Sequence, residues 1–219
     1  MRQIEEFGEN THQDHNKLIT ITGVSGCGKD FLISQMKNVG ILPDSVPIIS
    51  MGAELFSTLQ DIYPHLQSRD DIKRLLSHEE VRAGVSRLCD RIINQQPAIL
   101  NTHVVYRQAD SLTFNPDVER HLNPASYVYV WSDPKNIASW RHSDKTRSRP
   151  DESIDDIALH QELAMKITRT IATFNGSSIT IIWNREDNIC DNIDALHEQL
   201  ECLQMPSSIE RTYPVQNRI

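Results

Sequence analysis

Residues Gly23–Lys29, which read GVSGCGK, have the types and spacing of a phosphate-binding loop. An apolar, β-branched run at Leu18–Thr22 precedes this loop, and a helix-compatible segment at Phe31–Asn38 follows it. Glycines let the backbone adopt positive φ near an anion, and N–H groups at a helix N-terminus bind phosphate oxygens. The lysine of such a loop reaches the phosphoryl group that is transferred. The sequence therefore predicts a nucleotide site whose cofactor-binding residues include Gly23, Ser25, Gly26, Cys27, Gly28, Lys29 and Asp30.

A basic segment at 141–149 is the second group that could do chemistry, because it contains Arg141, Arg147 and Arg149 in a chain that is acidic overall. Guanidinium groups bind phosphate through two parallel hydrogen bonds and stabilise the charge that develops in a transition state. A segment of this kind can close over a nucleotide and exclude water. The alternative is a solvated, charged turn, but the phosphate loop in the same chain favours a catalytic lid.

Two further polar positions are candidates on the acceptor side. Arg69 stands at the start of a predicted helix and either holds an acceptor phosphate or lies on the surface. Asn101-Thr102-His103 follows a buried strand, where His103 either bonds an acceptor or serves a structural role.

The elements that must position these residues alternate between strands and helices. Strands are predicted at 18–22, 46–50, 98–100, 127–131 and 178–183. Helices are predicted at 31–38, 52–60, 72–93 (one long helix or two that abut), 134–140, 154–174 and 189–203, with a polar connection between Pro116 and Pro124. This alternation predicts an α/β fold with a parallel sheet, helices on both faces and Leu18–Thr22 near the centre.

Ligands of such folds lie beyond the carboxyl ends of the strands. We therefore expect the residues just after each strand to converge on one cleft: Gly23 onward, 50–53, 101–103, 132–134 and 184–185.

The composition limits the range of functions. A chain of 219 residues suits one α/β domain, predicted at 17–203 between polar tails at 1–16 and 204–219. The net charge of −8 argues against nucleic acid or an anionic membrane as the main partner, but not against a small anionic substrate. No apolar run approaches the roughly 20 residues of a membrane span. The four cysteines form no CxxC pair, so we expect a reduced, cytoplasmic location.

Together these stretches resemble the archaeal-type adenylate kinases, a family of P-loop nucleoside monophosphate kinases, from about Lys17 to Leu203. Besides GVSGCGK, the matching stretches are Ile49-Ser50-Met51-Gly52 with Phe56 (like an acceptor-side N-F-G), Arg69-Asp70 (R-D), Asn101-Thr102-His103 (D-T-H), Asp133-Pro134 before the lid, the arginines at 141, 147 and 149, His160-Gln161-Glu162 (H-Q-E) and Asn184-Arg185 (N-R).

The resemblance implies a P-loop kinase three-layer sandwich with a five-stranded parallel sheet, a lid at about 141–151 and an acceptor-binding segment. It implies transfer of the γ-phosphoryl group of ATP to AMP, with ATP and Mg²⁺ as cofactors, and it permits an oligomer. By resemblance, Lys29 and the lid arginines stabilise the migrating phosphoryl group. The residues implied on the acceptor side are Gly52, Arg69, Asn101, His103 and Gln161, and those beside the adenine are Asn184 and Arg185.

Two positions depart from the pattern of the family. Asp30 replaces the usual Ser or Thr, and Asn101 replaces the usual Asp, and both positions belong to the metal shell in the family. Together they suggest an exchange that moves one carboxylate from position 101 to position 30, with Asp30 as the metal ligand. The alternative is that Asp30 points away and caps its own helix. Some P-loop kinases, including phosphomevalonate kinases and phage deoxynucleotide kinases, also carry GKD, so Asp30 does not by itself imply an inactive enzyme. It does loosen the case for AMP as the acceptor.

Three functions therefore remain open on the sequence. The first is an ATP-dependent nucleotide kinase, and the second is a P-loop kinase for another nucleotide or a small phosphorylated metabolite. The third is a non-catalytic nucleotide-binding protein. Lys29 and the basic segment favour the two enzymes, because a binder has no transition state to stabilise.

Overall fold

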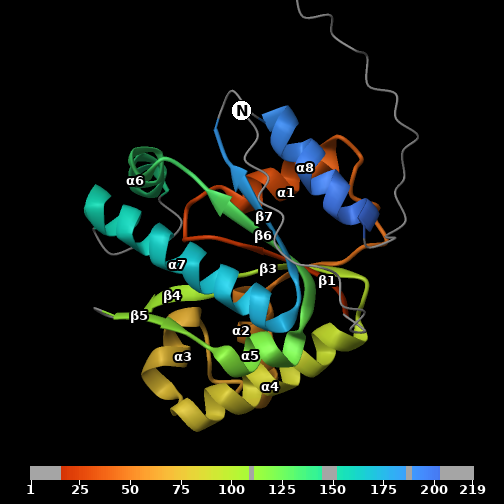
Figure 1. The fold of residues 1–219 in the computed structure, drawn as a ribbon. Helices are drawn as coiled ribbons and strands as arrows, with labels where there is room; N and C mark the ends of the chain where they lie inside the picture. The colour runs from red at the N-terminus through yellow and green to blue at the C-terminus, as the bar shows by residue number, and fades with distance from the viewer. Residues whose placement is uncertain (1–15, 109–110, 145–151, 186–188, 203–219) are drawn as a thin grey trace, which may run out of the picture.

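The computed structural model describes residues 16–108, 111–144, 152–185 and 189–202 (Figure 1). Both predicted tails, apart from Asn16, lie outside these ranges, as do Arg147 and Arg149 of the predicted lid. The described strands are β1 Asn16–Thr22, β2 Ile48–Ser50, β3 Ala98–Asn101, β4 Val105–Gln108, β5 Ser111–Phe114, β6 Pro124–Trp131 and β7 Ser178–Trp183. The described helices are α1 Lys29–Asn38, α2 Met51–Ile62, α3 Arg69–Leu75, α4 His78–Asn94, α5 Pro116–Leu122, α6 Pro134–Ser143, α7 Ile154–Asn175 and α8 Ile189–Cys202.

A five-stranded parallel sheet in the order β2-β3-β1-β6-β7 forms the centre of the molecule, which confirms the predicted fold and the central position of β1. Thr20 pairs with Leu100 on one side and Tyr127 on the other. Figure 1 shows α1 and α8 on one face of the sheet and α4, α5 and α7 on the other. Nearly all of β1 and β6 is buried, because both faces are covered. No helix in the described ranges is long and apolar enough to cross a membrane.

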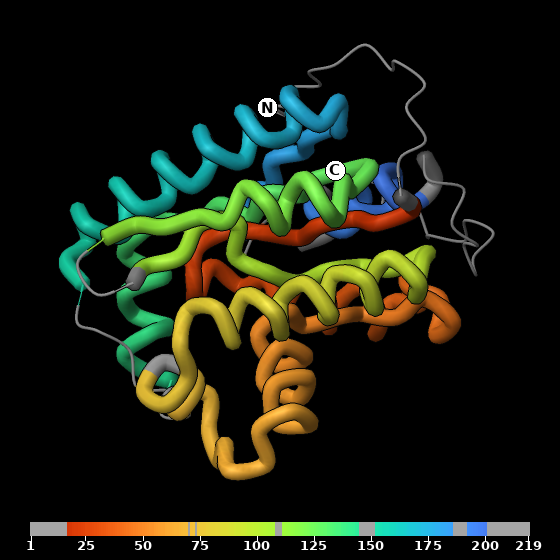
Figure 2. Tube along the Cα trace, turned by 90° about the horizontal axis from the view of Figure 1, so that it is seen from below, coloured from red at the N-terminus to blue at the C-terminus, as the bar shows by residue number. Residues whose placement is uncertain are grey.

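The segment from α2 to α3, orange to yellow in Figure 2, extends away from the sheet beside α4. The predicted helix at 72–93 is divided into α3 and α4 by Leu76 and Ser77. Ser77 begins α4 with a capping box, in which its N–H donates to Glu80 and its hydroxyl accepts from the Glu80 N–H. Ser68 caps α3, with its N–H bonded to Asp71. This division turns α3 back toward α2.

The predicted polar connection between Pro116 and Pro124 is the helix α5, which Asn115 caps with Pro116 in the first turn. Between Asn101 and this helix lies the antiparallel hairpin β4–β5, which was not predicted. β4 begins with Val105, Tyr106 and Arg107, and β5 also contains β-forming residues. Two such short runs close together in the chain are a hairpin signal that sequence reasoning missed. The hairpin matters because it borders the functional cavity described below.

Glu119 of α5 is a buried carboxyl group that accepts a hydrogen bond from the Tyr127 hydroxyl at 2.8 Å. Burial raises the pKa of Glu119 to about 7, although the bond from Tyr127 acts in the opposite direction. Burial likewise raises the pKa of Tyr127, so this phenol remains protonated at neutral pH. The pair therefore has one group, Glu119, that titrates near neutrality.

We expect the fold to lose stability between pH 5 and pH 8 through Glu119. The folded state binds this proton more tightly than the unfolded state, so the stabilisation is complete below the unfolded pKa and disappears as pH rises through 7. A shift from 4.5 to about 7 corresponds to about 3 kcal/mol. Urea unfolding of the wild type and of Glu119→Gln across this range measures the effect. The total loss of stability over this range should be larger in the wild type than in Glu119→Gln by about this amount; equal losses in the two proteins would contradict the assignment.

Candidate functional site

A large cavity of about 1230 Å³ lies beyond the carboxyl ends of the central strands. Its wall brings together the phosphate loop, the start of α2, α3, the residues after β3, the β4–β5 hairpin and the loop after β7. Of the residues predicted for the site, those that line it are Ser25, Gly26, Gly28, Lys29, Asp30, Gly52, Arg69, Asn101, His103, Asn184 and Arg185. Four of the five predicted strand ends thus converge there, whereas 132–134 does not contribute to the lining.

The carbonyl groups of the phosphate loop are held from outside by side chains. Lys29 Nζ donates to the carbonyl oxygens of Gly23 and Val24 at 3.0 and 3.1 Å. The carbonyl oxygen of Cys27 accepts from Ser132 Oγ at 2.7 Å and from Asn184 Nδ2 at 2.9 Å. With these carbonyls bound to side chains, the loop is shaped for its N–H groups to face an anion.

Gly28 is required at the start of α1 because its φ is +91°, a region that favours glycine. A Cβ at this position would collide with Nδ2 of Asn184, the side chain that holds the Cys27 carbonyl. A Cβ at Gly23 would lie 2.5 Å from the carbonyl oxygen of Val130. The sequence therefore needs both glycines so that the loop can pack against β6 and the loop after β7.

His103 holds the phosphate loop. Its Nδ1 lies 2.7 Å from the carbonyl oxygen of Gly23 and 3.3 Å from Lys29 Nζ. A carbonyl oxygen can only accept, so Nδ1 carries a proton in this arrangement. This contact joins the end of β3 to the start of the loop and fixes the wall against which Lys29 lies.

Asp30 and Asn101 meet directly, although 71 residues separate them in the chain. The amide Nδ2 of Asn101 donates to Asp30 Oδ1 at 2.5 Å. Gly28 is the N-cap of α1, and Asp30 in the first turn contacts Asn101, which favours the exchange over the alternative in which Asp30 points away and caps its own helix. Carboxylate and amide oxygens are ligands that Mg²⁺ prefers, and this ion usually takes one or two carboxylates plus substrate phosphates. The pair therefore fits a magnesium ion, with no group of three metal-ligating side chains among the described residues.

The part of the cavity beside α2, α3 and α4 combines two arginines, Arg69 and Arg82, with apolar walls. A Cβ on Gly52 would lie 3.6 Å from Arg69 Nη1, so the guanidinium lies over the first turn of α2. Ser50, the N-cap of α2, makes no side-chain capping bond, so the N–H groups of this turn are available to an anion beside Arg69. The apolar residues around this end are Leu55, Ile72, Leu76, Val81, Val85 and Val118.

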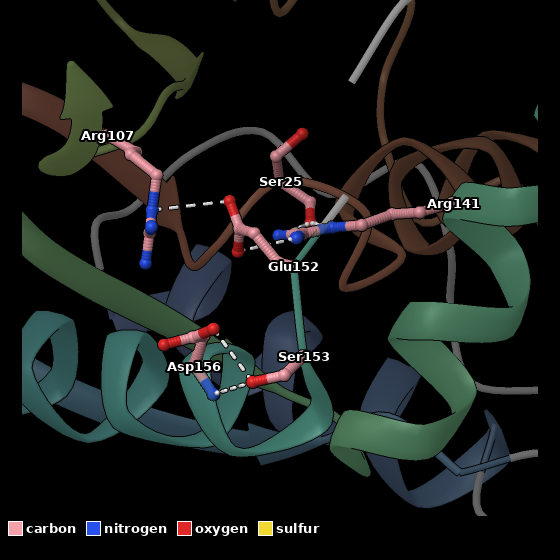
Figure 3. Close-up of polar contacts among 6 residues, drawn as sticks. All are labelled: Ser25, Arg107, Arg141, Glu152, Ser153 and Asp156. Carbon is pink, nitrogen blue, oxygen red and sulfur yellow. Dashed lines mark hydrogen bonds and ion pairs between the residues drawn. The ribbon is translucent and has the colours of Figure 1, made fainter. Parts of the chain in front are cut away.

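Arg141 lies in the last turn of α6 and not in a loop, and its side chain is only 9% exposed. Its Nε and Nη2 donate to the carbonyl oxygen of Ser25 at 2.9 and 2.8 Å, and its Nη1 donates to Glu152 at 2.9 Å (Figure 3). Ser153 caps the following helix, α7, by accepting from the N–H of Asp156. Arg141 is therefore bound to the outside of the phosphate loop.

Gln161 does not line the cavity, contrary to its predicted contact with substrate. It is fully buried, and its amide binds both backbone groups of Ser132: Oε1 accepts from the N–H at 3.2 Å and Nε2 donates to the carbonyl at 2.9 Å. Ser132 in turn holds the Cys27 carbonyl. Gln161 thus positions the phosphate loop through Ser132. Its neighbour His160 is also buried, and this burial lowers the pKa of the imidazole.

Gly23 and Cys27 also lie outside the cavity lining, where their carbonyls anchor the loop. Sequence reasoning missed three residues near the site. Tyr106 and Arg107 of β4 line the cavity, and the hairpin signal could have located them. Glu152 pairs with Arg141, and no sequence pattern indicated it.

The comparisons with known proteins agree with this geometry. Residues 22–158 match the family model described as an AAA domain. The adenylate kinase of Thermoplasma volcanium is 28% identical over 169 residues, which cover 76% of this chain and 90% of the relative. The adenylate kinase of Thermococcus kodakarensis is 26% identical over 196 residues, covering 87% and 97%. That of Methanocaldococcus jannaschii is 28% identical over 199 residues, covering 86% and 99%.

Solved structures share the fold at low identity. A shikimate kinase from Bacteroides thetaiotaomicron aligns with a TM-score of 0.53 and 15% identity, covering 84% of this chain and 98% of that one. A shikimate kinase from Acinetobacter baumannii, in complex with shikimate, aligns with a TM-score of 0.51 and 12% identity, covering 86% and 95%. With the phosphate loop, the sheet order and the family match in agreement, the chain belongs to the AAA domain family and is a P-loop phosphotransferase similar to the archaeal adenylate kinases.

Proposed function

We propose that this protein is an ATP-dependent nucleoside monophosphate kinase that transfers the γ-phosphoryl group of ATP to AMP or a related monophosphate. The observation that carries the proposal is the continuity of one cavity from Asn184 and Arg185, past Lys29, to Gly52 and Arg69. A donor phosphate at the loop and an acceptor phosphate at the start of α2 then face each other. Holding two reactants in this way replaces an encounter in solution by an intramolecular step.

The far end of the cavity supports a nucleotide acceptor in particular. Arg69 and the first turn of α2 provide positive charge for a monophosphate. The apolar side chains of α2, α3 and α4 provide a surface on which the flat face of a base can pack. An acceptor without an extended apolar part would leave this surface in contact with water.

The residues of this chain divide the work of phosphoryl transfer. Lys29 places a positive charge where the migrating phosphoryl group gathers negative charge, and the loop N–H groups hold the donor phosphates. Asp30 and Asn101 would hold the magnesium ion, which neutralises phosphate charge when it is bound. Gln161, Ser132 and His103 keep the loop in this shape. Closure of a lid at 141–151 over the nucleotides stays a prediction of the resemblance.

The test is a coupled assay with purified protein, ATP and Mg²⁺ against a panel of acceptors. The panel contains AMP, CMP, UMP, GMP, the deoxynucleotides and small phosphorylated metabolites, because Asp30 and Asn101 both depart from the adenylate kinase pattern. We expect a nucleoside monophosphate to give the highest kcat/KM. A phosphorylated metabolite as the preferred acceptor would overturn the nucleotide assignment, and ATP binding without any transfer would indicate a non-catalytic nucleotide-binding protein.

A further inference from the structure

Arg107 is a cavity residue for which the proposed mechanism has no role. It lies on β4, and its side chain is 27% exposed. Its Nε lies 3.3 Å from Oε1 of Glu152, while Arg141 binds the other oxygen of the same carboxylate. Figure 3 shows the two arginines approaching Glu152 from opposite sides, beside the carbonyl of Ser25. The Glu152 carboxylate therefore links the β4–β5 hairpin, through Arg107, to the phosphate loop, through Arg141.

The acidic groups near Arg107 lie outside the cavity lining. The Glu152 carboxylate, whose side chain is 6% exposed, is shared by two guanidinium groups, and Asp156 is a further acidic group whose charge interacts with Arg107. Arg107 and Lys29 line the cavity, whereas Glu152 and Asp156 do not. Partly buried cations are costly without anionic partners. A phosphate group in the cavity would give Arg107 an anionic partner on that side.

The two arginines differ in the donors that remain for a ligand. Arg141 directs Nε and Nη2 to the Ser25 carbonyl and Nη1 to Glu152, so each of its three side-chain nitrogens already donates to a protein oxygen. Arg107 forms an ion pair with Glu152 through Nε, without a hydrogen bond, which leaves its two Nη nitrogens for a ligand. A pair of Nη groups is the part of arginine that binds phosphate most specifically.

We propose that Arg107 is a further phosphate-binding residue, presented by the β4–β5 hairpin and oriented by Glu152. Arg141 holds the loop from outside, and Arg107 binds phosphate oxygens from the cavity side. Glu152 immediately precedes Ser153, the N-cap of α7, so the carboxylate is fixed by a long helix. The inference rests on the proposed function for the identity of the nucleotides, but phosphate binding by Arg107 can be measured without turnover.

The test is calorimetric titration with two probes, tripolyphosphate and adenosine. Charge-assisted bonds to phosphate are strong, so we expect Arg107→Gln to weaken tripolyphosphate binding by about tenfold or more. Arg107→Lys should bind tripolyphosphate with intermediate affinity, because it keeps the positive charge but loses the planar pair of donor nitrogens. Adenosine affinity should be unchanged in both variants, since this probe carries no phosphate. Arg107→Lys also keeps the test valid if the glutamine variant does not fold.

Arg91→Gln is the matched control, because Arg91 is also a partly exposed arginine paired with a glutamate, Glu54, but lies outside the cavity lining. It should bind both probes as the wild type does. Wild-type tripolyphosphate affinity in Arg107→Gln, equal losses for both probes, or no tripolyphosphate binding by the wild type would overturn the inference. A protein that transfers no phosphoryl group but shows the selective loss would disprove the proposed function and leave the role of Arg107 standing.

Discussion

Replacement of Lys29 by methionine is expected to lower the rate of phosphoryl transfer by about a thousandfold, which is the upper range for removal of one preorganised donor from a transition state. Lys29 is 6% exposed, and its ammonium group is held by the Gly23 and Val24 carbonyls near His103. The ammonium group is therefore positioned within the phosphate loop before a nucleotide arrives. Initial rates with saturating ATP and acceptor measure the loss in kcat.

Lys37→Met provides the matched control, since Lys37 is exposed in the last turn of the same helix. It should keep wild-type activity. Because Lys29 also binds loop carbonyls, circular dichroism and thermal unfolding should accompany the kinetics to show that Lys29→Met is folded. A folded Lys29→Met variant with more than about a tenth of wild-type kcat would contradict the catalytic role, since the expected loss is far larger.

The second large effect concerns Asp30 and Asn101, whose side chains are in direct contact. Asp30→Thr removes the carboxylate, and Asn101→Asp adds a second carboxylate against the first, where like charges repel. We expect each single change to lower magnesium-dependent phosphotransfer by about a hundredfold, the scale for a disturbed metal shell. The double variant returns one carboxylate at position 101 beside a hydroxyl at position 30. We expect it to recover to within about tenfold of the wild type, because the local charge is then restored.

The four proteins form a double-mutant cycle, and activity is measured for each across a magnesium titration. If Asp30 and Asn101 have exchanged roles, the second substitution should offset much of the loss caused by the first, which the cycle reports as a large coupling energy between the two positions. If the double variant is no better than the product of the single effects, then the two positions act independently. In that case Asp30 is not a substitute for the carboxylate that the family carries at the end of its third strand.

The sequence was sufficient to predict the central architecture because strand periodicity and loop chemistry are local. The run at Leu18–Thr22 and the glycines that follow it require a buried strand and a phosphate loop, and parallel topology then brings Asn101 to Asp30. The helical period also contained the signal for Gln161. It shares a face with Ile157, Ala164 and Thr168, which are all buried, so an inward, positioning role could have been predicted.

The relations around Glu152 could not be predicted in the same way. Its pairing with Arg141 and Arg107 depends on how α6, α7 and the hairpin are oriented, and the spacing of residues in the sequence does not predict that orientation. The hairpin carries a sequence signal, but a weak one, because its strands are four residues long and lie outside the main sheet. Short strands gain their stability from the surfaces they cover, which a local pattern does not show.

Product analysis by ³¹P NMR, with ATP, Mg²⁺ and AMP as the only substrates, is the most direct measurement of phosphoryl transfer to a nucleotide. We predict that the AMP signal falls as ADP forms, with two ADP molecules for each AMP consumed and no inorganic phosphate. Lys29→Met should leave the ATP and AMP signals unchanged over the same period. Release of inorganic phosphate with AMP untouched would show that water is the acceptor, and it would contradict the assignment of Arg69 and α2 as an acceptor site.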